Sequence, residues 1–344
     1  MAEPWYQPGV YPVADGIHRI PLTLPDDGLR AVNTFVIEDG PGVVLVDPGQ
    51  YGSLARQELT EGLATLGYRL GDVRRCLATH VHRDHYTNAV ALRRELGCPV
   101  SLGAGERGSL AAVRASRVYG IDPQLRALPA CGAASLVDEV DPERAGHGLP
   151  TGVWQDPDEW LADGATVELT SRTLRVVRAP GHTTGHVMFH DTEAGLVFTG
   201  DHVLPRITPS IGFEPVTTPL PLAAFLASLR KTHALPDGTL AAAHGPVSDS
   251  THERVTELLT HHADRLERTL DLVRAGAETV HDVARGLRWT RRERELEELD
   301  PFNRMLAVLE TKAHLDVLTD RDVVRRGTSA GVLRYAPHTP TAAR

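Results

Sequence analysis

The chain has 344 residues, of which 41% are hydrophobic and 24% charged, and its net charge is −9 at pH 7. This composition is typical of a globular protein, and the length predicts a main domain with an appendage. No stretch approaches the roughly 20 apolar residues of a membrane span, and we expect neither a signal peptide nor a membrane partner. The three irregularly spaced cysteines favour reduced thiols and a cytoplasmic location.

The first hundred residues predict strands and one helix. Residues 17–47 suit antiparallel strands with one buried face, because apolar residues alternate around 33–37 and 43–46. A strand over Val73–Ala78, a helix from Thr87 to Leu96 and a strand over 99–102 follow. The loop between the strand over Val73–Ala78 and the helix from Thr87 is the most informative part of the sequence.

That loop places three histidines and an aspartate within six positions: His80, His82, Asp84 and His85. Neutral imidazole and carboxylate are the side chains that bind zinc and similar divalent ions. The loop also follows the end of a buried strand, a position at which catalytic and binding residues are common. A chance cluster of surface histidines is the alternative interpretation.

Three downstream segments repeat this design. In each, a His or Asp follows a short apolar run, and a nearby glycine allows a tight bend. The residues are His182, after the strand predicted over Leu174–Val177, Asp201, after 195–198, and His244, after 241–243. Four ligand-bearing loops of one design imply a shared metal site and count against a chance cluster.

At these motifs the chain resembles the metallo-β-lactamase superfamily, over about residues 15–250. The resemblance implies an α/β (α+β) fold: a four-layer αββα sandwich of two sheets flanked by helices. It also implies a dinuclear metal centre, with two Zn²⁺ expected and Mn²⁺ or iron as alternatives, since affinity and availability both decide. By this resemblance the ligands of one ion are His80, His82 and His182, those of the other are Asp84, His85 and His244, and Asp201 bridges the two.

Two divalent ions about 3.5–4 Å apart can share a bridging hydroxide, because each lowers the pKa of bound water. The hydroxide would attack a carbonyl or phosphoryl centre while a metal ion polarises the oxygen on which charge builds. Asp84 could orient the hydroxide and carry its proton afterwards, and Asp201 would bridge the two ions. Asp84 and Asp201 are therefore the expected catalytic residues. We expect Asp47, in the motif similar to the family's first, and His202 to support the ligands through hydrogen bonds, and His186 to be structural.

The ligand set also narrows the reaction. No cysteine lies where the common antibiotic-degrading lactamases have a ligand, and the set is similar to the glyoxalase II, lactonase and ribonuclease branches. Glutathione-binding signatures are not evident. We therefore expect a hydrolase of a small or medium-sized ester, thioester or lactone, with a small-molecule substrate. A metal-dependent endoribonuclease and a mononuclear iron sulfur dioxygenase are the alternatives.

The charge distribution bears on the ribonuclease alternative. Basic and acidic side chains balance over residues 251–344, so the whole negative excess lies in residues 1–250. Nucleic-acid binding normally needs a basic surface. The charge thus argues against a nucleic-acid partner without excluding one.

We expect a catalytic domain over 1–250 and a tail over 251–344. The catalytic domain carries an insertion over 103–160, helical over Glu106–Tyr119, and a Pro-rich loop over 203–221. In this loop Arg206 is a candidate anchor for an acidic group of the substrate. The tail predicts helices over Thr251–Arg274, near 279–287 and from Pro301, then a hairpin over Val323–Tyr335. This order of elements resembles the winged-helix-like tail of one branch of the superfamily. The tail of this chain is partly apolar, which leaves a homodimer possible.

Overall fold

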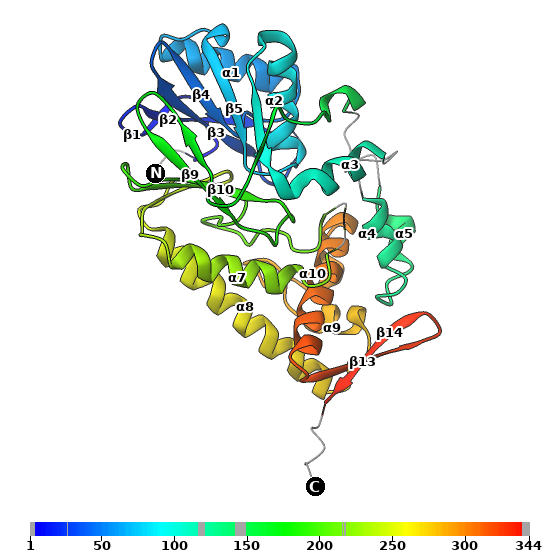
Figure 1. Cartoon of the computed structure of the whole chain (residues 1–344). Helices are drawn as coiled ribbons and strands as arrows, with labels where there is room; N and C mark the ends of the chain where they lie inside the picture. The colour runs from blue at the N-terminus through cyan, green and yellow to red at the C-terminus, as the bar shows by residue number, and fades with distance from the viewer. Residues whose placement is uncertain are drawn as a thin grey trace.

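The computed structural model describes residues 4–25, 27–115, 121–141, 149–214, 216 and 218–338. Within these residues, two sheets pack face to face with helices on their outer sides (Figure 1). The first sheet has the order β1-β2-β3-β4-β5-β6-β7, with β1 (Tyr11–Ala14), β2 (Ile17–Thr23), β3 (Ala31–Asp39), β4 (Gly42–Val46), β5 (Val73–Ala78), β6 (Val100–Gly103) and β7 (Glu159–Leu161). The second has the order β12-β11-β10-β9-β8, with β8 (Thr166–Glu168), β9 (Thr173–Arg178), β10 (Val187–Asp191), β11 (Leu196–Gly200) and β12 (Thr239–Ala242).

Helices complete the four layers. On the first sheet lie α1 (Ser53–Thr65) and α2 (Arg83–Leu96), and on the second lie α7 (Pro221–His233) and α8 (Thr251–Arg274) (Figure 1). Between β6 and β7 the chain forms α3 (Arg107–Ala115), α4 (Asp122–Ala127) and α5 (Leu136–Glu139). After α8 come α9 (Val280–Gly286), α10 (Pro301–Asp320) and the hairpin of β13 (Val324–Ser329) and β14 (Val332–Pro337). Short 3₁₀ turns lie at Leu70–Asp72, Ala104–Glu106, Thr151–Val153 and Leu296–Glu298.

The core explains why β4 is an unbroken apolar strand. Val43 and Leu45 pack with α1 and α2, whereas Val44 and Val46 face the core between the sheets. The expectation of one buried face for residues 17–47 was therefore wrong for this strand, because helices cover the outer face of the sheet. The antiparallel pairing of β2 with β3 and of β3 with β4 was predicted correctly.

Element boundaries agree with the sequence analysis at β5 and α8, and differ at α2. This helix begins at Arg83 rather than Thr87, so that Asp84 and His85 lie in its first turn. A carboxylate in the first turn interacts favourably with the positive end of the helix dipole. Two of the predicted ligands are thus held by a helix and not by a mobile loop.

The predicted insertion over 103–160 is shorter in the structure. Gly103 ends β6, and β7 pairs with β6 in parallel, so the segment between the two strands runs from 104 to 158. Of the helix expected over Glu106–Tyr119, α3 covers the part up to Ala115. The remainder, 116–119, lies outside the described residues.

The second half of this segment packs with the tail. Ile121 and Leu128 belong to the same hydrophobic core as Val280 of α9 and Met305 of α10. The backbone N–H of Leu333 in β14 also donates to the carbonyl of Ala130, at 2.8 Å. Because this core also contains residues of α7, the division at residue 250 stays a prediction. No helix among the described residues is long and apolar enough to cross a membrane.

The first prediction concerns the contact between the two sheets at Gly185. A Cβ atom placed there would overlap the backbone nitrogen of Glu106, and one at Gly103 would overlap the carbonyl oxygen of Gly185. Gly185→Ala should therefore lower the free energy of unfolding by about 1–3 kcal/mol, the usual cost of overpacking. Gly71→Ala is the control, since nothing lies within 4 Å of a Cβ there. Equal losses of unfolding free energy in the two variants, measured by urea unfolding, would contradict this packing.

Candidate metal centre

Four predicted ligands and the supporting residue Asp47 follow the ends of strands. Asp47 follows β4, His80 follows β5, His182 follows β9, Asp201 follows β11 and His244 follows β12. The pairs β4/β5 and β11/β12 are parallel, so within each sheet their carboxyl ends meet at one edge. Chain segments far apart in sequence thereby bring their ligands to one place.

The first group contains His80, His82, His182 and Asp201, and one potential ligand atom from each lies within 4.8 Å of the others. His82 Nδ1 is 3.0 Å from His182 Nε2, which in turn is 3.5 Å from Asp201 Oδ2. Two imidazole nitrogens bound to one tetrahedral zinc ion, at about 2.0–2.1 Å each, lie roughly 3.3 Å apart. The observed spacing suits a single ion between these rings.

The second group contains Asp84, His85 and His244. His244 Nε2 lies 3.3 Å from Asp84 Oδ2 and 3.3 Å from Asp201 Oδ1. His85 Nε2 lies 3.5 Å and 3.6 Å from the same two oxygens. Asp201 therefore presents Oδ2 to the first group and Oδ1 to the second, which is the arrangement of a bridging carboxylate.

The unpaired atoms of the two groups test whether a metal fits. His80 Nε2, His85 Nε2, His244 Nε2 and Asp201 Oδ1 are buried and have no hydrogen-bond partner. A buried polar atom without a partner costs about 1–3 kcal/mol. Imidazole and carboxylate together suit zinc, manganese or iron. The residues therefore fit a pair of divalent metal ions, and each predicted ligand role remains a prediction.

The pKa shifts differ between the two ligand groups. Burial lowers the pKa of His80 and His82 well below the usual range, so both rings are neutral. Burial opposes ionisation of Asp84, but His85 and His244 hold the pKa of its carboxyl well below its ordinary value. Metal ions require neutral imidazole and ionised carboxylate, which His80, His82 and Asp84 supply. Against the effect of burial, nearby carboxylates raise the pKa of His85 and of His244, so these two rings would release protons when an ion binds.

Hydrogen bonds outside the ligand groups fix the orientation of the rings. His182 Nδ1 donates to the carbonyl of Ser210 at 2.9 Å, and His244 Nδ1 donates to the carbonyl of Ala31 at 2.7 Å. Because a carbonyl only accepts, Nδ1 of each ring carries a proton, and Nε2 is the atom that faces the other members of its group. In the neutral ring the lone pair lies on Nε2, where a metal ion would bind.

Asp47 lies where the sequence analysis expected a supporting residue. Its carboxylate accepts hydrogen bonds from the N–H and the hydroxyl of Thr79, each at 2.8 Å. Asp47 Oδ2 also lies 3.0 Å from His85 Nδ1. The side chain thus connects the loop after β4 with the loop after β5.

The two other histidines near the centre have different surroundings. His202 is fully buried, its Nε2 lies 3.0 Å from Thr232 Oγ1 of α7, and burial lowers its pKa to about 3. His186 Nε2 accepts the backbone N–H of Asp201 at 3.1 Å. Neither ring belongs to a ligand group. Arg206 is exposed, and no described contact joins it to the centre.

Three supporting residues were missed by the sequence analysis. Asn33 Nδ2 donates to the carbonyls of Ala242 and Gly245, on either side of His244. A lone asparagine within the apolar strand β3 was a signal that could have revealed this contact. Glu106 and Glu214 gave no signal, because they lie in irregular segments far from the loop that they hold.

These two glutamates hold the loop that carries His182. Glu106 accepts a hydrogen bond from the hydroxyl of Thr183. Glu214 accepts hydrogen bonds from the N–H and the hydroxyl of Thr184, at 2.6 and 2.7 Å. Glu106 is fully buried, and burial raises the pKa of its carboxyl to about 8. The segment after β6 is thereby connected to the metal centre through a protonated acid.

The second prediction follows from the pKa of Glu106. In the unfolded chain a glutamate titrates near pH 4.3, so between about pH 4.3 and 8 the folded state holds a proton that the unfolded state has released. The contribution of Glu106 to the free energy of unfolding is complete below about pH 4.3 and falls as the pH rises toward 8. Glu106→Gln should remove that fall, so the difference in unfolding free energy between wild type and variant should shrink or reverse toward pH 8. Urea unfolding at several pH values measures it, and parallel curves would contradict it.

Comparison with known proteins gives relatives at low identity. A protein named atrochrysone carboxyl ACP thioesterase, from Aspergillus fumigatus, is 26% identical over 277 residues. The match covers 79% of this chain and 52% of the Aspergillus protein, so the chain spans about half the length of that relative. A protein named hydroxyacylglutathione hydrolase, from Methylococcus capsulatus, is 27% identical over 263 residues, covering 74% of this chain and 82% of its own.

Solved structures match over almost the whole chain. A metallo-beta-lactamase family protein from Thermus thermophilus has a TM-score of 0.77 at 29% identity, covering 94% of this chain and 99% of the other. A beta-lactamase domain protein from Burkholderia ambifaria has a TM-score of 0.79 at 25% identity, covering 95% and 94%. The sequence model of the metallo-beta-lactamase superfamily matches residues 27–244, more than half of the chain. The chain therefore belongs to the metallo-beta-lactamase superfamily.

Proposed function

We propose that this protein is a dinuclear zinc hydrolase that cleaves a thioester of a small or medium-sized acyl group. The observation that carries the proposal is the position of Asp201, which faces the first ligand group with one oxygen and the second with the other. The names of two relatives, a thioesterase and a hydroxyacylglutathione hydrolase, support the choice of a thioester among carbonyl substrates. The intact second group favours two ions over the mononuclear iron alternative.

The chemistry divides between the ions and the chain. Two bound ions would supply Lewis acidity, activating water and polarising the thioester carbonyl. Asp84 is ionised and 7% exposed, so it can orient the attacking water and accept its proton. The rings of His182 and His244 are held by backbone carbonyls and need no reorganisation during the reaction. Such preorganised groups stabilise developing charge more strongly than solvent does.

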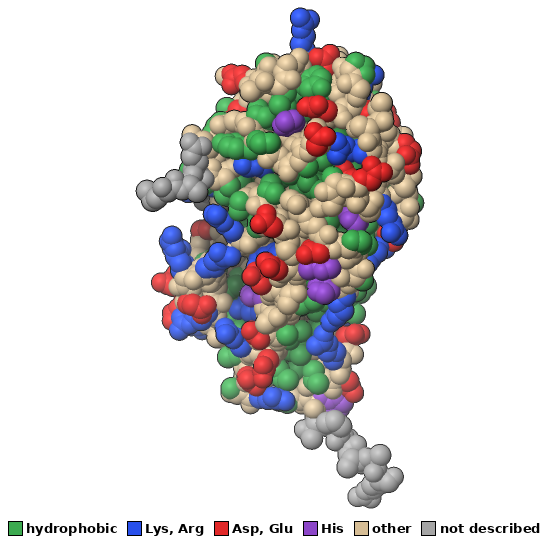
Figure 2. Space-filling view, turned by 90° about the vertical axis from the view of Figure 1, so that its left-hand side faces the viewer, with side chains coloured by type: hydrophobic (Ala, Val, Ile, Leu, Met, Phe, Trp, Pro, Cys, Tyr) green, Lys and Arg blue, Asp and Glu red, His purple; other side chains and the backbone are tan. Residues whose placement is uncertain are grey.

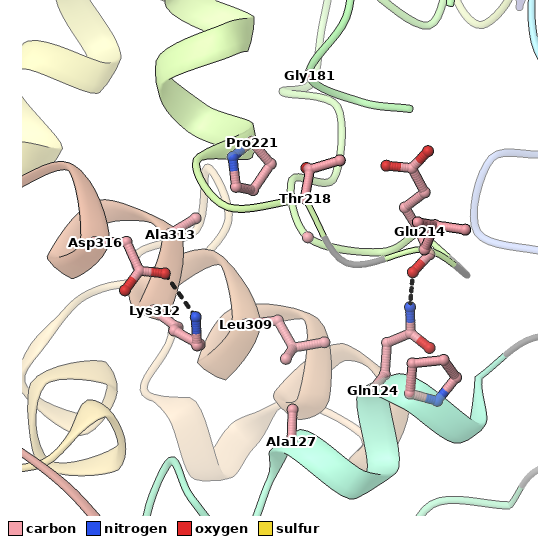
Figure 3. A pocket seen from close by; sticks show the side chains of 13 residues that line it. Gln124, Ala127, Gly181, Glu214, Thr218, Pro221, Leu309, Lys312, Ala313 and Asp316 are labelled. Carbon is pink, nitrogen blue, oxygen red and sulfur yellow. Dashed lines mark hydrogen bonds and ion pairs between the residues drawn. The ribbon is translucent and has the colours of Figure 1, made fainter. Parts of the chain in front are cut away.

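A pocket beside the His182 loop supports an acyl substrate (Figure 3). Its volume is about 80 Å³, below the range of about 300–1,000 Å³ that is common for whole ligand sites, so it would hold only part of a substrate. Its wall includes Gly181, which precedes His182, and Glu214, which binds the loop at Thr184. The remaining lining residues come from α4, the loop before α7, the start of α7, and α10: Pro123, Gln124, Ala127, Gly212, Val216, Thr218, Pro221, Leu309, Lys312, Ala313 and Asp316.

The elements that line the pocket suit a site for substrate recognition. The segment after β6 and the tail each supply one side, and the lining combines aliphatic groups with few polar ones (Figure 3). Aliphatic side chains such as Leu309 and Ala313 would contact an acyl chain. Gln124 donates to the carbonyl of Glu214 and Lys312 is paired with Asp316 (Figure 3), so a polar head group would use the remaining N–H donors of these side chains. Arg206 is not among the lining residues, so a role for it in substrate binding lacks support from this pocket.

The surface gives little support to a ribonuclease. On the face shown in Figure 2, lysine and arginine side chains are interspersed with aspartate and glutamate and do not form one continuous basic surface. The net charge of −9 agrees with this view. Because phosphate backbones are bound mainly by clustered basic groups, a small-molecule thioester is the preferred substrate.

The third prediction tests the proposal with Asp84→Ala and a panel of acyl thioesters of increasing chain length. Loss of a ligand and of the proton acceptor should lower kcat/KM by at least about 100-fold, as changes around catalytic metals do. Asp264→Ala, which removes an exposed aspartate of α8, should retain full activity.

Two results would count against the proposal. Unchanged thioester hydrolysis in Asp84→Ala would remove this centre from the reaction. Zinc-loaded wild-type protein that cleaves lactones or RNA but none of the thioesters would show that the substrate class is wrong while leaving the metal centre in place.

A further inference from the structure

A separate cluster of potential ligands lies between α8 and α10, which pack against each other in the tail (Figure 1). His261 and His262 come from α8 and Glu310 comes from α10. One ligand atom from each lies within 4.8 Å of the others. None of these residues belongs to the loops that carry the active-site ligands, and His261 is exposed while His262 is fully buried.

A chain of hydrogen bonds fixes the tautomer of His262. His314 Nδ1 lies 2.8 Å from the carbonyl oxygen of Glu310, and His314 Nε2 lies 3.2 Å from His262 Nδ1. The carbonyl can only accept, so a neutral His314 has its proton on Nδ1 and accepts with Nε2. His262 must then donate from Nδ1, which leaves a free lone pair on its Nε2.

That lone pair has no partner within the protein. His262 Nε2 is buried and makes no hydrogen bond, although a buried polar atom of this kind normally does. Burial holds the pKa of His262 well below its usual value, so the ring stays neutral. An imidazole with one nitrogen bonded to an acceptor and the other bare is the arrangement found in metal-binding histidines.

Glu310 is the third component. It is half-buried, and among the described residues its carboxylate has neither an ion pair nor a hydrogen bond. The nearby cation, Arg265, donates instead to the carbonyl of Arg288 and lies over the ring of Trp289, 4.3 Å from its centroid. Burial raises the pKa of Glu310, a penalty that a bound cation would offset.

We propose that His261, His262 and Glu310 bind a divalent transition-metal ion, with His314 positioning the ring of His262. Two imidazoles and one carboxylate suit zinc and its neighbours. The exposure of His261 places the site at the surface, where water can complete the coordination. An ion bound there connects α8 to α10, and α10 supplies one wall of the acyl pocket.

The test compares Zn²⁺ bound at equilibrium by wild-type protein, His261→Ala and Glu310→Gln, measured by dialysis and elemental mass spectrometry. Each variant should bind one equivalent less than the wild type. His252→Ala, which removes a histidine in the first turn of α8, should bind as much as the wild type. Because the result is a difference in stoichiometry, it does not depend on whether the active-site centre is filled or hydrolyses a thioester.

A positioning role for His314 has its own readout. His314→Phe should retain the site but weaken its Zn²⁺ affinity about 10–100-fold, as loss of such partners does, measured by competition with a chelator. Equal Zn²⁺ content in the wild type, His261→Ala and Glu310→Gln would overturn the site. The same loss in His252→Ala would show binding by surface histidines at large and would overturn it as well.

Discussion

The folded structure buries potential ligand atoms that have no hydrogen-bond partner within the protein, and the rest of the site depends on holding them there. His80, His85, His244 and Asp201 each hold such an atom at the centre. At about 1–3 kcal/mol each, their cost approaches the roughly 5–15 kcal/mol by which domains are stable. Metal ions that accept these lone pairs would offset the cost, and folding would then be coupled to metal binding. The sheet edges and supporting hydrogen bonds serve to hold these atoms in place against that cost.

The support comes from distant parts of the chain. Asn33 holds the His244 loop from β3, Asp47 links the loops after β4 and β5, and Glu106 and Glu214 hold the His182 loop. The last two also connect the centre to the acyl pocket, because they belong to the segments that surround it. The tail shares a core with α7 and lines the pocket through α10. On the proposed function, substrate recognition and catalysis would use different elements that meet at the His182 loop.

Local patterns were sufficient for part of this account. The ligand motifs, the strand Val73–Ala78 and the helix Thr251–Arg274 depend on residues close in sequence, and the structure has both elements as expected. The start of α2, the burial of both faces of β4 and the role of Glu106 were missed. The last two depend on tertiary contacts: helices cover the outer face of β4, and Glu106 meets Thr183 across 77 positions. No periodicity reports such pairings, because they arise only when the sheets have packed.

Anomalous diffraction at the zinc edge, on crystals of the zinc-loaded protein, tests the central claim most directly. Two ions should appear about 3.5–4 Å apart, one beside His80, His82 and His182, the other beside Asp84, His85 and His244, with the carboxylate of Asp201 between them. A single ion, or two ions that Asp201 does not bridge, would contradict the dinuclear centre and the mechanism built on it.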